Sequence, residues 1–167
     1  MSLYSKLLHI VGRQNNGKTT LIVDLVKELT ARDLRVGTLK HSAHEHELDK
    51  PGKDSYRHRI AGADPAACVT QNLIAIYIPR RQDDDPFDRI SALFNDTDLV
   101  LVEGYIDRPG KKIEVWRQET GEAPIFSERD GGISAVITDS PIDTNLPVWP
   151  RTNVKGLADN ICRMLEI

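Results

Sequence analysis

The sequence predicts a single α/β domain with a mostly parallel sheet flanked by helices, and three observations predict it. An apolar run at 7–11 precedes a glycine-rich stretch, and apolar residues at helical spacing follow from 18 to about 32. A short β-branched segment at 35–40 comes next, so strand, helix and strand form one βαβ unit with parallel strands. The run at 99–102 is entirely apolar, as expected for a strand buried on both faces of a parallel sheet.

The rest of the chain adds shorter elements to this sheet. Residues 66–70 and 73–79 predict two strands joined across Gln71 and Asn72, which form a small β excursion at about 66–80. Residues 112–117 alternate in polarity and predict a strand with one face open to water. Further strands are expected at 135–138 and 147–149, and further helices at 54–61, 86–94 and 154–165. Because no linker or repeat interrupts these elements, we expect one domain over residues 1–167.

Composition limits the class of protein. A chain of 167 residues with 40% hydrophobic and 28% charged residues is typical of a soluble globular domain. The formal net charge of -3 argues against nucleic-acid binding, and no apolar run is long enough to span a bilayer. The N-terminal segment lacks the small-residue cleavage site of a signal peptide. Cys68 and Cys162 lie far apart without metal-ligand spacing, so we expect reduced thiols in a cytoplasmic protein.

Residues 12–19, with the sequence GRQNNGKT, have the G-x-x-x-x-G-K-[ST] spacing of a phosphate-binding loop. The loop stands between a predicted strand and a predicted helix, which is the context that the motif requires. Its glycines let backbone N–H groups point at an anion, and the helix N-terminus adds partial positive charge. Lys18 would reach the outer phosphates, and the Thr19 hydroxyl would ligate Mg²⁺. We therefore predict that a nucleoside triphosphate binds with magnesium at Gly12, Asn15, Asn16, Gly17, Lys18, Thr19 and Thr20.

A phosphate-binding loop needs a carboxylate partner for magnesium, usually after an apolar strand. Two acids flank the strand 99–102, Asp98 before it and Glu103 after it. Neighbouring parallel strands present their C-terminal ends on the same side as the loop, so we assign Glu103 to magnesium, directly or through water. Asp98 lies at the opposite end and is expected to be structural. Gly104 would let the backbone approach the γ-phosphate.

The base of the nucleotide could be read by Asp139. This carboxylate ends the apolar strand 135–138, late in the chain, where it would accept from two neighbouring donors of guanine. The sequence N-K-x-D, familiar from guanine readers, is absent. The alternative is that Asp139 only begins the turn before Pro141.

A polar segment at 41–54 follows the strand at 35–40 and carries three histidines, His41, His44 and His46. Ligands of open α/β sheets bind at this end of the strands, so we interpret the segment as a functional loop. The histidines and nearby acids could bind a transition metal. A solvent-exposed or phosphate-facing surface is the commoner use of such a segment. Three adjacent carboxylates at 83–85 similarly favour the solvated first turn of a helix over a metal site.

Several stretches, in this order, resemble the molybdopterin-guanine dinucleotide biosynthesis protein B family (MobB). The most specific are DKPGKDSYRH at 49–58 and LVEGY at 101–105, since the phosphate loop is shared by many families. The loop with Thr20-Leu21, Lys40-His41 and Ala61-Gly62-Ala63 also match, whereas the last third resembles the family more loosely. The chain departs from the pattern at 13–16, where relatives often have small residues.

The resemblance implies a P-loop NTPase-type, SIMIBI-like fold that binds GTP and Mg²⁺, hydrolyses GTP slowly at most, and forms an interlocked homodimer. It further implies an accessory role beside the MobA-type guanylyltransferase that joins GMP to molybdopterin, and possibly beside other molybdenum-cofactor proteins. Lys18 and either Asp49 or Asp54 would then act in catalysis, the acid by placing the attacking water or assisting magnesium. Three cations would contact phosphate groups of the nucleotide or of molybdopterin: Lys50, Lys53 and Arg57.

Two other functions fit the phosphate loop. The chain could be a small-molecule kinase, with Arg80 and Arg81 closing on phosphate as lid arginines. It could also be a nickel-type metallochaperone GTPase that uses the histidines of the segment 41–54. A kinase would transfer phosphate to an acceptor, and a metallochaperone would bind Ni²⁺ or Zn²⁺ through those histidines.

Overall fold

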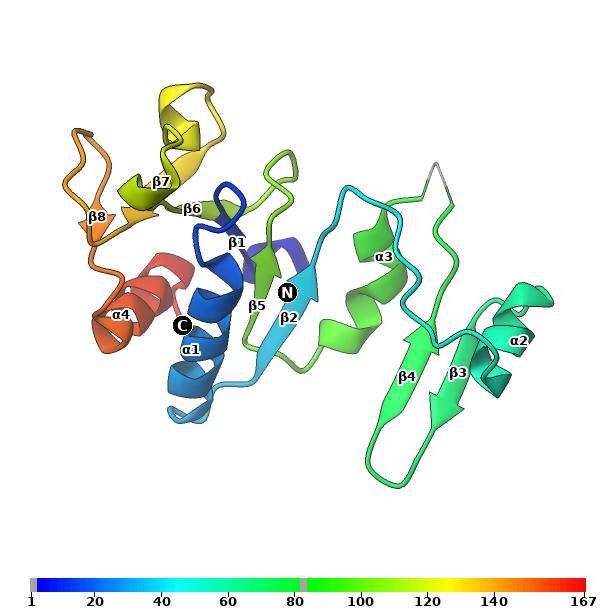
Figure 1. Cartoon of the computed structure of the whole chain (residues 1–167). Helices are drawn as coiled ribbons and strands as arrows, with labels where there is room; N and C mark the ends of the chain where they lie inside the picture. Colours follow the sequence, from blue (N-terminus) through cyan, green and yellow to red (C-terminus); the bar gives the residue numbers. More distant parts are fainter. Residues whose placement is uncertain (1–2, 82–83) are drawn as a thin grey trace. The chain divides into compact units, whose positions relative to one another are not determined.

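The computed structural model describes residues 3–81 and 84–167 (Figure 1). The chain divides into two compact units. One comprises residues 1–42 and 91–167, described from Leu3 onward, and the other comprises residues 43–90. The phosphate loop belongs to the first unit, and most of the polar segment 41–54 belongs to the second.

The first unit is built on a six-stranded sheet with the order β2-β5-β1-β6-β7-β8. Every pairing in this sheet is parallel, as the sequence predicts. The C-terminal ends of β1, β5, β6 and β7 therefore lie along one edge of the sheet. The strands are β1 (Leu7–Val11), β2 (Val36–Lys40), β5 (Leu99–Glu103), β6 (Lys111–Val115), β7 (Ile133–Ile137) and β8 (Val148–Trp149).

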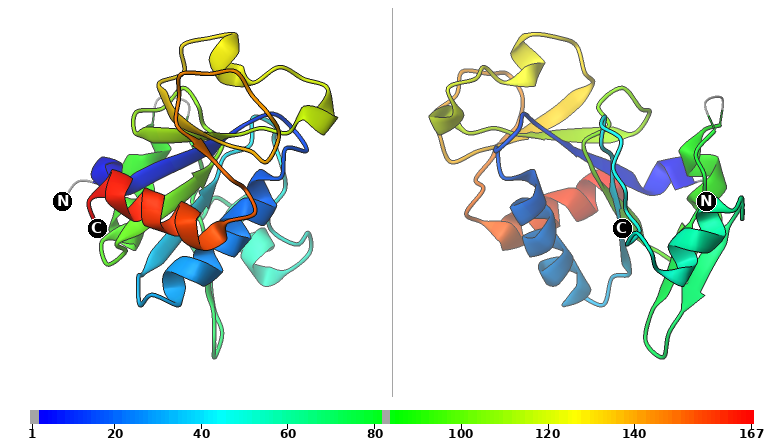
Figure 2. Two further views of the ribbon diagram at one scale, coloured as in Figure 1. Left: turned by 90° about the vertical axis from the view of Figure 1, so that its left-hand side faces the viewer. Right: turned by 45° about the vertical axis from the view of Figure 1, so that its right-hand side comes forward.

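Helices α1 (Lys18–Thr30) and α4 (Val154–Leu165) lie side by side on one face of this sheet (Figure 2). Leu21, Leu25 and Leu29 of α1 are fully buried because they recur on one side of the helix. They share a core with Leu157 and Ile161 of α4 and with inward side chains of the strands. The Asn153 side chain caps α4 by accepting a hydrogen bond from the Gly156 N–H at 3.1 Å.

The first unit also contains short 3-10 helices: η1 (Leu3–Lys6), η2 (Ser91–Phe94), η3 (Gln118–Thr120) and η4 (Ile125–Ser127). Phe94 of η2 lies directly against Gly37, where an added Cβ would stand 2.7 Å from the phenyl ring. The expected helix 86–94 is thus an α-helix, α3 (Pro86–Ile90), continued by η2.

The prediction that strand 112–117 has a face open to water is wrong. Strand β6 lies between β1 and β7, and its Glu114 side chain is fully buried. The carboxylate accepts hydrogen bonds from the backbone N–H groups of Ile125 at 2.6 Å and Phe126 at 3.0 Å. Burial raises the pKa of Glu114, while these two donors lower it. The polar alternation therefore reflects a buried carboxylate satisfied by η4 and not contact with water.

The second unit contains α2 (Asp54–Ile60), β3 (Ala66–Val69), β4 (Ile74–Tyr77) and α3. Strands β3 and β4 form an antiparallel hairpin in which Ala66 pairs with Tyr77, as the sequence predicts. The expected β excursion at 66–80 is thus the hairpin of a larger unit. Asp83, one of the three adjacent carboxylates, lies outside the described residues. No helix among the described residues is long and apolar enough to cross a bilayer.

Candidate nucleotide-binding site

The loop 12–17 has the backbone that its glycines predict. Gly12 has φ of 144°, and an added Cβ would stand only 2.3 Å from the Val115 carbonyl oxygen. Gly17 has φ of 84° in the left-handed region and precedes the first residue of α1. Side chains are strained or excluded at both positions, so glycine lets the loop turn closely around the sheet edge into the helix.

Lys18 extends along this loop. Its Nζ donates to the carbonyl oxygens of Gly12 at 2.8 Å and Arg13 at 2.7 Å. Burial lowers the pKa of Lys18, and the nearby Glu103 carboxylate raises it in part. The ammonium is therefore partly desolvated at the loop, where interactions with phosphate are stronger than in open water.

Glu103 stands beside the loop. It ends β5, and its Oε1 and Oε2 lie 2.9 and 3.0 Å from the hydroxyl oxygen of Thr19, which donates to the carboxylate. Lys40, which ends β2, places its Nζ 3.1 Å from Glu103 Oε1. A carboxylate and a hydroxyl are hard oxygen ligands of the kind that Mg²⁺ takes beside nucleotide phosphates, so Glu103 and Thr19 fit the ion.

Asp98 lies at the other end of β5, as the strand-end argument predicts. Its Oδ2 accepts from the Arg35 N–H at 2.7 Å, and its own N–H donates to the Arg35 carbonyl at 2.8 Å. These contacts join the starts of β5 and β2. Asp98 therefore has a structural role at the edge of the sheet opposite to the loop.

The loop opens onto a hollow of about 490 Å³. The residues that line it come from the loop, from α1, from the ends of β2 and β5 and from the segment after β6. They include most of the residues predicted to bind phosphate and magnesium. Its lining residues are Gln14, Asn15, Gly17, Lys18, Thr19, Thr20, Lys40, Glu103 and Arg117.

A second hollow, of about 320 Å³, adjoins the ends of β6 and β7. It is lined by Val115, Trp116, Arg117, Glu119, Asp139, Ser140 and Arg151, so Arg117 borders both hollows. Asp139 Oδ1 accepts from the N–H and the hydroxyl of Thr152, at 3.2 and 3.1 Å. Within the described part of the chain, Oδ2 forms no hydrogen bond. One oxygen of this carboxylate is thus anchored, and the other can accept from a ligand.

Besides Gly12, whose backbone is described above, two predicted loop and strand-end residues do not line either hollow. The Gly104 N–H donates to the Ile10 carbonyl at 2.9 Å, so it is already engaged within the sheet. Its carbonyl oxygen lies 3.2 Å from Nδ1 of the buried His9. Asn16 is fully buried, and its Oδ1 lies 3.1 Å from the Thr120 hydroxyl. Both residues therefore support the loop and the strand end through hydrogen bonds and do not face the hollows.

The predicted catalytic acids and phosphate-contacting cations of 49–57 all lie in the unit 43–90. Asp49 is buried, and its Oδ1 accepts from the Lys50 N–H at 2.8 Å and the Ser55 hydroxyl at 3.1 Å. These bonds hold the turn that leads into α2. Lys50, Lys53 and Arg57 are exposed, and so is Asp54, which lies 3.9 Å from the Arg57 guanidinium.

The three histidines are divided between the units. His41 stacks on Tyr105 with ring centroids 3.8 Å apart, joining the segments that follow β2 and β5. His44 and His46 lie edge to face at 6.3 Å in the other unit. In the described residues, no group of three or more His, Cys, Asp or Glu side chains is arranged to hold a metal ion.

Comparison with known proteins identifies the family. The family model described as molybdopterin guanine dinucleotide synthesis protein B, MobB, matches residues 7–139. The chain belongs to the MobB family. The matched region includes the phosphate loop, Glu103 and Asp139. It includes every lining residue of both hollows except Ser140 and Arg151, which line the second.

Two similar proteins are named molybdopterin-guanine dinucleotide biosynthesis adapter protein. The one from Escherichia coli K12 is 33% identical over 163 residues, covering 96% of this chain and 93% of its own. The one from Haemophilus influenzae is 36% identical over 157 residues, covering 93% and 86%. The crystal structure of Bacillus subtilis MobB matches with a TM-score of 0.72 at 27% identity, covering 95% of this chain and 96% of that one. These neighbours agree with the P-loop NTPase-type fold that the sequence predicts.

Sequence reasoning missed Arg117 and Thr120. Arg117 follows a strand that ends at the loop edge of the sheet, so the strand-end argument applied to β6 could have found it. Thr120 ends the short 3-10 helix η3, and the sequence carries no signal that places it against Asn16.

Proposed function

We propose that this chain is a GTP-binding adapter of molybdopterin-guanine dinucleotide biosynthesis that acts in the cytoplasm with Mg²⁺. The observation that carries the proposal is the pair of hollows that meet at Arg117. One hollow holds the phosphate loop, and the other presents the Asp139 carboxylate. A purine nucleotide that spans both would have its phosphates on backbone N–H groups and a guanine edge on a carboxylate. The names of the similar proteins support the pathway.

Magnesium would be held by Thr19 and Glu103. When bound, it would neutralise charge on the outer phosphates. The Lys40 ammonium beside Glu103 contributes further positive charge at the same end of the hollow. We propose that hydrolysis is slow at most. Of the two acids proposed to place a water, Asp49 is occupied in holding its own turn, and Asp54 is exposed.

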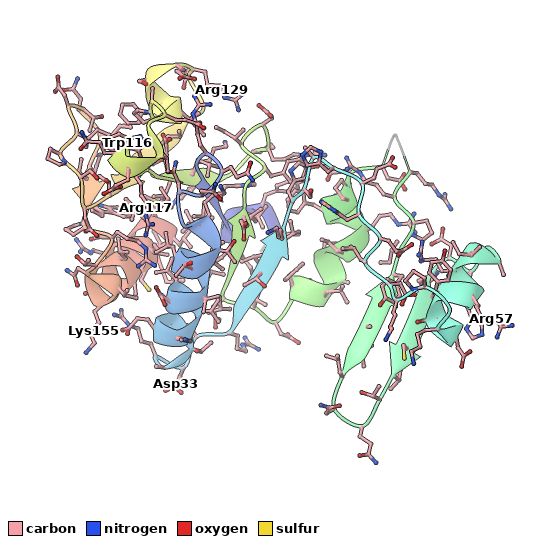
Figure 3. The ribbon with its side chains drawn as sticks, viewed as in Figure 1. Asp33, Arg57, Trp116, Arg117, Arg129 and Lys155 are labelled. Atoms are coloured by element: carbon pink, nitrogen blue, oxygen red, sulfur yellow. The ribbon has the colours of Figure 1, made fainter. Side chains whose placement is uncertain are left out.

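Lys50, Lys53 and Arg57 are proposed to contact phosphate groups of the nucleotide or of molybdopterin. All three are exposed and follow one another around the start of α2. Arg57 is labelled in Figure 3, where its side chain extends outward from α2. Dissolved ions screen exposed charges, so the contribution of these cations to phosphate affinity should fall as the salt concentration rises.

We further propose that two copies of the chain pair through the hairpin of unit 43–90. Six of the ten large apolar side chains that are exposed in the described residues belong to this unit: Leu48, Ile60, Val69, Leu73, Ile74 and Ile76. An isolated two-stranded hairpin is marginally stable, and its edges can pair with a further strand. Light scattering should report a dimer that Ile74→Asp dissociates. Val23→Asp, at an exposed position of α1, should leave the dimer intact.

The GTP site is tested by calorimetric titration of Mg·GTP into wild-type protein and Lys18→Ala. Loss of a charge-assisted contact to phosphate should weaken binding by about 1.5–3 kcal/mol, roughly 10- to 150-fold. Lys27→Ala is the matched control, because Lys27 is an exposed lysine of the same helix outside the hollow. Equal GTP affinity in folded Lys18→Ala and Lys27→Ala would overturn the site assignment.

The partner is tested with a purified MobA-type guanylyltransferase. An adapter should form a complex with this enzyme that calorimetry or light scattering detects, and a non-interacting enzyme serves as the control. A wild-type protein that binds GTP but not the guanylyltransferase would retain the nucleotide site and refute the partnership.

A further inference from the structure

We propose that Arg117 binds the phosphate of the nucleotide nearest the sugar, and that Thr120 positions Arg117 by linking it to the phosphate loop. This inference rests on the proposed GTP site and adds to it the group that joins its two halves.

Arg117 occupies the boundary between the hollows. It follows β6, and its guanidinium lies so close to Gly17 that an added Cβ there would meet Cζ and one terminal nitrogen at 3.4 Å. Figure 3 labels it near the N-terminal end of α1. A nucleotide with phosphates at Lys18 and its base at Asp139 must pass this guanidinium where its phosphate chain meets the sugar.

The charge of Arg117 is not neutralised by the protein. Within the described residues, its guanidinium forms no hydrogen bond and no ion pair. Two arginines around the same site differ in this respect. Arg151 pairs with Asp24 at 2.6 Å, and Arg13 pairs with Glu122 at 3.1 Å and with Glu128. An exposed, unpaired guanidinium beside a phosphate-binding loop has the geometry to take a phosphate oxygen with two parallel N–H donors.

The backbone that carries Arg117 is fixed on one side by Trp116. The Trp116 side chain is buried, and its indole N–H donates to the Glu122 carbonyl at 2.8 Å. The Trp116 backbone N–H donates to the Ile137 carbonyl at 3.1 Å, which continues the pairing of β6 with β7. The backbone that leads into Arg117 is thus held at the edge of the sheet.

Thr120 fixes the other side and connects it to the loop. Its Oγ1 lies 2.8 Å from the Arg117 carbonyl and 3.1 Å from Asn16 Oδ1. One hydroxyl proton cannot serve both acceptors. Asn16 Nδ2 is buried without a partner, and turning the amide over lets it donate to Thr120 while Thr120 donates to Arg117. A continuous hydrogen-bonded chain then runs from the phosphate loop to the backbone of Arg117.

The experiment is calorimetric titration of Mg·GTP and Mg·GDP into wild-type protein, Arg117→Ala, Arg117→Lys and Arg163→Ala. Arg163 lies on α4 outside both hollows and controls for the change in net charge. Arg117→Ala should lose about 10- to 100-fold in affinity for both nucleotides alike, because both contain the phosphate nearest the sugar. Arg117→Lys should retain part of the affinity, and Arg163→Ala all of it.

Thr120→Val removes the hydroxyl at nearly constant volume. It should weaken GTP binding severalfold in the wild-type background and not further in the Arg117→Ala background, since a positioning residue acts only through the group it positions. An equal loss in both backgrounds would show that Thr120 acts on the loop alone and overturn its assignment.

The remaining outcomes separate the two proposals. If Arg117→Ala binds both nucleotides as well as Arg163→Ala does, the Arg117 assignment is overturned while the GTP site stands. A loss confined to GTP would place Arg117 on the γ-phosphate and contradict the inference. If wild-type protein binds neither nucleotide, the proposed function itself fails.

Discussion

Replacing Asp139 by Asn should change which base the site accepts. In the structure, Asp139 Oδ1 is held by the N–H and the hydroxyl of Thr152 at 3.2 and 3.1 Å. An asparagine oxygen can accept both of these bonds, so the amide should keep its oxygen on Thr152 and turn its NH₂ group toward the second hollow. The variant therefore offers a donor where the wild-type protein offers an acceptor.

The magnitude follows from the number of bonds at stake. Guanine presents N1–H and a 2-amino group side by side, and in the proposed site the free Oδ2 would accept from them. Loss of this charge-assisted contact should weaken GTP by about 1–3 kcal/mol, roughly 5- to 150-fold. Xanthosine triphosphate carries a carbonyl in place of the amino group, so the variant should gain affinity for it. ATP should bind wild-type protein weakly, because adenine has no donor at N1 and leaves the carboxylate unpaired.

Competition binding with GTP, ATP and xanthosine triphosphate on both proteins measures these changes. Thr152→Val is the second variant, since it removes one bond that orients the side chain of residue 139. A folded Asp139→Asn that keeps its GTP affinity and gains nothing for xanthosine triphosphate would make Asp139 a turn residue only.

Three further changes test the site and its scaffold. Glu103→Gln should weaken the magnesium dependence of GTP binding by tenfold or more, whereas Asp98→Asn should leave it unchanged; the reverse order in a magnesium titration would refute the strand-end argument. Gly12→Ala should abolish binding, since its Cβ would stand 2.3 Å from a backbone carbonyl, and normal GTP affinity in the variant would contradict this. Burial lowers the pKa of His9 from 6.5, so the unfolded chain takes up a proton that the folded chain does not. Stability should fall as pH drops through about 6.5, by at most about 1.4 kcal/mol per pH unit, and denaturant titrations of His9→Gln at about pH 7.5 and 5.5 should show a smaller fall than wild type.

Local patterns in the sequence were sufficient to predict most of the sheet. The apolar run at 7–11 and the helical spacing after Lys18 correspond to β1 and α1, because each element buries one continuous set of side chains. The placement of Glu103 beside the loop and of Asp98 at the opposite end of β5 needed only the polarity of parallel strands. These are properties of single segments and of one general rule of topology.

Contacts between distant segments were not predictable in the same way. The alternation in 112–117 has the same appearance whether its polar residues meet water or buried donors, and only η4 shows that Glu114 is buried. Arg117 lies one hundred residues after Gly17 in the chain, and the pairing of β1 with β6 brings them together. The division at 43–90 depends on how strands and helices contact one another, which composition does not reveal.

The most direct measurement of the central proposal is a crystal structure of the chain with Mg²⁺ and a non-hydrolysable GTP analogue. It should show the phosphates on the backbone of 12–19 and Mg²⁺ about 2.0–2.1 Å from Thr19 Oγ1. Glu103 should contact the ion directly or through water, and guanine should donate from N1 and its amino group to Asp139. A nucleotide bound away from the loop, or a guanine edge turned away from Asp139 into solvent, would contradict the proposed GTP site.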